Sequence, residues 1–72
     1  MKDEKEIRET KELAMRVRTL YHDALHILAD AQKHQASRVV SENLSTAANR
    51  ASKALDSLKI TLAENGVFDE SL

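Results

Sequence analysis

The chain has 72 residues, 42% hydrophobic and 32% charged, with eleven basic and twelve acidic side chains and a formal net charge of −1. A chain this short forms one small domain, residues 1–72, and the absence of cysteine excludes disulfides and thiolate metal sites, so stability calls for self-association or a partner. The balanced charge is not typical of nucleic-acid-binding proteins, and no apolar run approaches the ~20 residues of a membrane span. Because the opening stretch has no apolar signal-peptide core, we expect a cytoplasmic protein.

The first predicted helix covers about residues 4–34. Its apolar residues recur at helical spacing and span an arc of roughly 160° around the axis. This arc is wider than the seam of a two-stranded coiled coil, which indicates contact with two or more neighbouring helices. The apolar residues are Ile7, Leu13, Ala14, Val17, Leu20, Tyr21, Ala24, Leu25, Ile27, Leu28 and Ala31.

Residues 32–45, QKHQASRVVSENLS, contain neither Gly nor Pro, so a single long helix has to be considered. In a continuous helix, however, the apolar residues before and after this stretch would face directions roughly 160° apart. A chain reversal between His34 and Ser41 lets both sets face each other, with Ser37 or Ser41 as the N-cap of the second helix. We therefore predict a turn at about residues 35–40.

The second predicted helix covers about residues 41–65, and its apolar residues span a narrower arc of roughly 120°. Four alanines form a small-residue surface that permits close helix packing. At the end, the sequence LAENGV predicts a Schellman motif, with Gly66 in the left-handed conformation and Val67 folding back towards Leu62. Residues 66–72 form a tail, which we expect to be loosely held apart from Phe68. The four alanines are Ala47, Ala48, Ala51 and Ala54.

Two helices alone would leave much of the broad apolar arc of the first helix exposed, which is unusual for a monomer. Pairing two hairpins would cover it. The sequence therefore predicts an all-α fold: an antiparallel two-helix hairpin that dimerises into a four-helix bundle. The predicted dimer interface consists of Val17, Tyr21, Ala24, Leu25, Leu28, Ala51, Leu55 and Leu58.

His22 and His26 are spaced i,i+4, as in helical sites for Zn²⁺ or another transition metal. The row lies on the polar side of the first helix and has no third ligand in a shaped cavity, so we interpret it as a solvated row and predict no metal and no cofactor. The chain also lacks a Gly-rich loop or an acid pair in an evident cavity, and we predict no enzymatic activity.

Several apolar residues lie off the two apolar arcs, and two arginines lie near them. Single exposed apolar residues are common and usually carry no function, but a cluster of them rimmed by arginine is typical of a protein-binding patch. We therefore hypothesise a non-enzymatic regulatory or adaptor protein, of the kind that phages and other mobile elements carry. The predicted partner-binding residues are Met15, Arg16, Arg18, Val39, Ile60 and Phe68.

The layout resembles that of the Rop family of plasmid RNA-binding hairpin dimers: a similar length, an uninterrupted apolar repeat and an acidic tail after Gly66. The resemblance covers layout only, and no stretch matches the family's RNA-contacting positions. It implies one alternative function, a nucleic-acid-binding hairpin dimer. A structural coiled-coil assembly protein is a second alternative.

Overall fold

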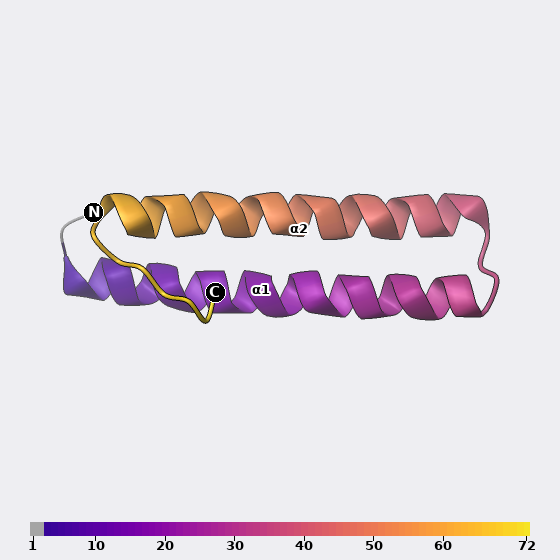
Figure 1. The fold of residues 1–72 in the computed structure, drawn as a ribbon, viewed down its shortest axis with the longest axis horizontal. Coiled ribbons are helices and arrows are strands. Elements are labelled where there is room, and N and C mark those ends of the chain that lie inside the picture. The colour runs from indigo at the N-terminus through magenta and orange to yellow at the C-terminus, as the bar shows by residue number, and fades with distance from the viewer. Residues whose placement is uncertain (1–2) are drawn as a thin grey trace.

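A computed structural model describes residues 3–72, which form two helices, α1 (Glu4–Lys33) and α2 (Arg38–Glu64). The helices run antiparallel, side by side along their whole length, and a short turn joins them at one end (Figure 1). The result is a rod of 48 × 17 × 15 Å. The predicted all-helical hairpin is therefore confirmed, and residues 3–72 contain no strand. Within the same residues, neither helix is long and apolar enough to cross a membrane.

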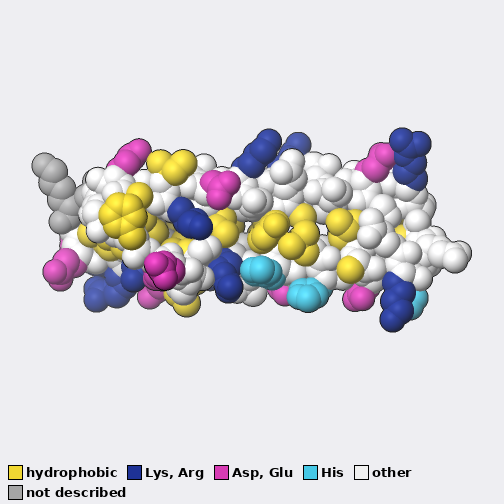
Figure 2. Space-filling model, in the orientation of Figure 1, with side chains coloured by type: hydrophobic (Ala, Val, Ile, Leu, Met, Phe, Trp, Pro, Cys, Tyr) yellow, Lys and Arg dark blue, Asp and Glu magenta, His cyan; other side chains and the backbone are white. Residues whose placement is uncertain are grey.

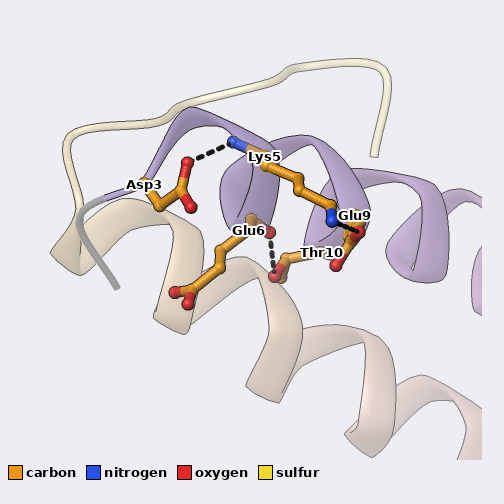
Figure 3. A network of polar contacts seen from close by, with 5 residues as sticks. All are labelled: Asp3, Lys5, Glu6, Glu9 and Thr10. Carbon is orange, nitrogen blue, oxygen red and sulfur yellow. Dashed lines mark hydrogen bonds and ion pairs between the residues drawn. The ribbon is translucent and has the colours of Figure 1, made fainter.

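Helix α1 begins with a side-chain cap (Figure 3). The carboxylate of Asp3 accepts a hydrogen bond from the backbone N–H of Lys5 at 2.9 Å, which satisfies one of the free N–H groups of the first turn. The Lys5 ammonium lies 4.0 Å from the Glu9 carboxylate, and the Thr10 hydroxyl donates to the Glu6 carbonyl at 2.7 Å. The Asp3 cap defines where the helix starts. Because these contacts are exposed, they add little stability.

The end of α1 is a Schellman motif formed without glycine. The N–H of Ala36 donates to the carbonyl of Ala31 at 2.9 Å, and the N–H of Gln35 donates to the carbonyl of Gln32 at 3.2 Å. Gln35 occupies the left-handed position of this motif, with φ at 57°. The left-handed conformation costs an L-residue about 1–2 kcal/mol, so the chain reverses here at a local energetic cost.

Replacing Gln35 with glycine is expected to raise the free energy of unfolding by about 1 kcal/mol, because glycine adopts positive φ without a steric penalty. The matched control is Gln32→Gly, inside the last turn of α1, where glycine is expected to lower it by about 1 kcal/mol. Urea unfolding of both variants measures the two effects. A decrease for Gln35→Gly would show that the reversal does not depend on this backbone conformation.

Helix α2 begins at Arg38 because Ser37, and not Ser41, is its N-cap. The Ser37 hydroxyl accepts a hydrogen bond from the N–H of Val40 at 3.3 Å. One turn into the helix, the Arg38 guanidinium and the Glu42 carboxylate form an i,i+4 ion pair at 2.7 Å. The chain reversal is therefore shorter than residues 35–40, and the second helix begins three residues earlier than predicted.

The seam between α1 and α2 follows a coiled-coil spacing. Buried and half-buried positions recur at alternating intervals of three and four residues, which keeps one stripe of each helix facing the other. On α1 this stripe is Ile7, Thr10, Ala14, Val17, Tyr21, Ala24, Leu28 and Ala31. On α2 it is Ser41, Leu44, Ala48, Ala51, Leu55, Leu58 and Leu62, and the C-cap residue Asn65 continues it.

The core is small and lies towards the end of the rod opposite the turn. Ala14 is completely buried, Leu62 is 2% exposed, and both belong to one cluster with Leu55. The four alanines of α2 separate into two pairs: Ala48 and Ala51 are buried against α1, whereas the other two are exposed. The alanines in the seam permit a close approach of the helix axes, and the leucines supply the buried area.

The predicted Schellman end of α2 is confirmed. Gly66 has φ at 76°, its N–H donates to the carbonyl of Ala63 at 2.9 Å, and the N–H of Val67 donates to the carbonyl of Leu62 at 2.9 Å. Space does not explain the glycine, because a Cβ at this position would meet no atom within 4 Å. The backbone conformation alone favours it.

The tail differs from its prediction. Residues 67–72 fold back across α1 (Figure 1), and Val67 and Leu72 pack against the core cluster. Phe68, which we expected to be the held residue, is 81% exposed. The physical reason is the sharp reversal at Gly66, which turns Val67 towards the core and the next side chain towards solvent. The lysine Lys11 also holds the tail through Asp69, at 3.4 Å.

Candidate protein-interaction surfaces

The returning tail forms a shallow groove with α2, which we call the tail groove. Its volume is about 330 Å³ and its lining is mostly apolar. Charged groups, among them Lys59 and Glu70, stand at its edge. The apolar lining is made by Ile60, Leu62, Ala63, Val67, Phe68 and Leu72.

Asp69 anchors the tail beside this groove. Its carboxylate accepts hydrogen bonds from the Ser71 hydroxyl at 2.6 Å and from the Ser71 N–H at 2.9 Å, and it pairs with Lys11. The hydrogen bonds from Ser71 first, and the charge of Lys11 second, lower the pKa of Asp69 below its ordinary value of 3.8. The carboxylate form is therefore the one that holds the tail.

Protonation of Asp69 is expected to loosen the tail. Because its pKa is lower in the folded chain than in the unfolded one, its contribution to stability is present above about pH 4 and is lost as the pH falls through the lowered folded value. Asp69→Asn should release residues 67–72 already at neutral pH, whereas Glu70→Gln, with the same change in charge, should not. NMR amide exchange of the tail measures this, and equal exchange in both variants would contradict the anchoring role.

The seam has two flanks along the rod, and the first is the tail side. On α1 it carries Lys11, Arg18 and Leu25, each seven residues apart, and Lys11 holds the tail there. On α2 it carries Ser45 and Lys59, since Ser45 shares a cavity with Leu25 and Lys59 lines the tail groove. Figure 2 shows apolar side chains following the seam on the tail-facing surface, with histidines beside them on α1.

The opposite flank of the seam, which we call the leucine side, has a different character. On α1 it carries three large apolar side chains spaced seven residues apart, each about half exposed. Two of them share a shallow cavity with Val17 and Arg16. On α2 the corresponding row contains small or medium apolar side chains, also spaced by seven. The two rows are Leu13, Leu20 and Ile27 on α1, and Val40, Ala47 and Ala54 on α2.

Most of the predicted dimer-interface residues lie in the seam of a single chain. Ala24, Ala51 and Leu55 are buried there, so they have little area left for a second chain. Val17, Tyr21, Leu28 and Leu58 are half-buried, and Leu25 is exposed on the tail side. Leu13, Leu20 and Ile27 were not separated from the seam in the sequence, because seam residues such as Ala14 and Tyr21 follow the same seven-residue spacing.

Two of the predicted partner-binding residues are brought together: Ile60 and Phe68 both line the tail groove. Arg16 lies at the leucine side instead, beside Leu13 and Leu20. Val39 is exposed close to the turn, at the other end of the rod. The remaining two, Met15 and Arg18, are exposed on α1. The structure therefore divides these six residues among separate surfaces.

The histidines are exposed, and the His22 ring lies tilted beside that of Tyr21, with ring centroids 5.4 Å apart. His26 is one helical turn further along the same face. Across residues 3–72, no group of three or more His, Asp or Glu side chains is placed to hold a metal ion.

Comparisons with known proteins do not connect the chain to a family. No protein-family model, no curated protein and no solved structure matches it.

Proposed function

We propose that this protein is a small non-enzymatic regulatory or adaptor protein that acts in the cytoplasm, forms a homodimer and binds another protein through its helical surface. One observation carries the proposal: the hairpin leaves large apolar side chains exposed along its whole length. Where such side chains gather, as along the leucine side and in the tail groove, exposed apolar surface is typical of protein interaction sites. The exposed large apolar residues are Leu13, Met15, Leu20, Leu25, Ile27, Val39, Val40, Ile60 and Phe68.

The tail groove supports the partner-binding half of the proposal. Phe68 is an exposed aromatic side chain next to Ile60, and aromatic side chains at the centre of an apolar patch commonly dominate binding energy. Lys59 and Glu70 place charge of both signs at the edge, which suits a partner segment with an apolar centre and polar ends. We assign partner binding to this groove.

Affinity capture from the source cell, followed by binding measurements with the captured protein, tests the assignment. Phe68→Ala and Ile60→Asp are expected to weaken partner binding at least tenfold with unchanged melting, because both side chains are exposed in the free chain. Val39→Asp is the matched control, since Val39 is equally superficial but lies at the turn end. Equal loss in all three variants would contradict the groove as the site. Failure of the wild-type chain to capture any protein would contradict the adaptor function.

A further inference from the structure

The two rows of the leucine side complement each other in size. The α1 row consists of Leu13, Leu20 and Ile27, and the α2 row contains Ala47 and Ala54. Both rows repeat every seven residues, so the large side chains of one chain and the small side chains of another have the same spacing. A surface with its knobs on one helix and its hollows on the other fits a second copy of itself.

The levels of the residues along the rod also match. Tyr21 lines the same cavity as Ala48 and Asn49, so these residues lie at one level of the hairpin. Leu20, one position before Tyr21, therefore lies at a level between Ala47 and Ala54. If a second chain is related by a two-fold axis parallel to the rod, its levels are unchanged. The Leu20 side chain of each chain then faces the gap between the two alanines of the other.

From these observations we infer that the leucine side is the homodimer interface, with α1 of one chain packed on α2 of the other and both turns at the same end. The inference rests on the proposed homodimer and specifies its contact surface. In this arrangement every pair of neighbouring helices is antiparallel, as in many four-helix bundles. In the opposite arrangement, with the turns at different ends, the leucine rows would meet each other and the alanine rows would face a gap.

Charged side chains at the edges of the leucine side offset one another. Asp23 and Arg50 lie on the outer edges of the leucine side, on α1 and α2 respectively, and both are exposed. Within residues 3–72 neither of them takes part in an ion pair. Across the two-fold axis, Asp23 of one chain lies within about one helical turn of Arg50 of the other, judged from the matching levels. Arg16 of the first chain, which also lies at the leucine side, is equally close in level to this Arg50, so attraction and repulsion offset each other and exposed charge contributes little affinity.

The outline of the leucine side has the size of a standard protein interface. One long side of a rod of 48 × 17 Å offers on the order of 800 Å², which is the area that each partner contributes to an interface of standard size. The tail side cannot offer its full length, because residues 67–72 lie across it. It also carries Lys11, Arg18 and Lys59, whose like charges would approach one another in a symmetric contact.

Light scattering tests the choice of surface. The wild-type chain is expected at twice its mass of 8.1 kDa, and Leu20→Lys at the mass of one chain with its helical circular dichroism retained. Ile60→Lys is the matched control, because Leu20 and Ile60 are both 59% exposed in the single chain, and it should remain a dimer. If the dimer survived Leu20→Lys and dissociated on Leu25→Lys, the leucine side would not be the interface, and the proposed homodimer would still stand. A monomeric wild-type chain would contradict both the proposed homodimer and the inferred interface.

Cross-linking tests the orientation without destabilising the chain, and the absence of native cysteine gives a clean background. A mixture of Leu20→Cys chains and Ala47→Cys chains, treated with a short thiol-reactive cross-linker, is expected to yield mainly the mixed pair. Leu20→Cys chains alone should cross-link at least tenfold less. Efficient cross-linking between two Leu20→Cys chains would show that the α1 rows of the two chains face each other, which would contradict the inferred arrangement.

Discussion

Replacing Leu62 with alanine is expected to lower the melting temperature by at least about 8 °C. Leu62 is 2% exposed and packs with Ala14, Leu55 and the returning tail residues. Truncating a buried leucine costs about 2–5 kcal/mol, and each kcal/mol corresponds to about 4–8 °C in a domain of this size. Thermal unfolding followed by circular dichroism at a fixed protein concentration measures the effect.

Ile60→Ala is the control for this prediction, because Ile60 lies on the same helix and is largely exposed. Its substitution is expected to change the free energy of unfolding by no more than about 0.5 kcal/mol. If Leu62→Ala melted within a few degrees of the wild type, the cluster around Leu62 would not be the stabilising core of the hairpin.

The second large effect is expected from Ala14→Leu. Ala14 has no exposed surface, and its small side chain lets α1 approach α2 closely at this level. The added carbon atoms have no space, so the helices must separate or the neighbouring side chains must leave their preferred rotamers. We expect a loss of about 1–3 kcal/mol in the free energy of unfolding, measured in urea.

Ala29→Leu provides the matched comparison, since Ala29 is exposed on the same helix and leucine is a good helix former. This substitution is expected to leave the free energy of unfolding almost unchanged. A wild-type stability for Ala14→Leu would mean that the helices are further apart at this level than the buried alanine indicates.

The hairpin could be predicted because its two apolar stripes would point in opposed directions on a single helix, whatever residues formed the turn. The end of α2 was equally readable, since Gly66 is the residue that the left-handed position favours. The end of α1 was not, because Gln35 takes that conformation under tertiary constraint and against its own preference. Local propensity therefore identified one of the two reversals, and the global pattern identified the other.

The surfaces were less predictable than the fold. Separating Leu20 from its neighbour Tyr21 requires the direction of the seam, which follows from the pairing of both helices and is not a property of α1 alone. The meeting of Ile60 with Phe68 depends on the path of the tail after Gly66, which the sequence does not specify.

The turn closes the hairpin at one end only, and the other end is closed by noncovalent contacts of the tail. Contacts near the turn join residues close in sequence, whereas those around Leu62 close a loop of most of the chain, which has the higher entropic cost. Local unfolding of the hairpin should accordingly begin at the end opposite the turn and proceed towards the turn. Because the tail forms one wall of the groove, a partner bound there holds the tail in place and opposes this opening, so occupancy of the groove and local unfolding are thermodynamically linked.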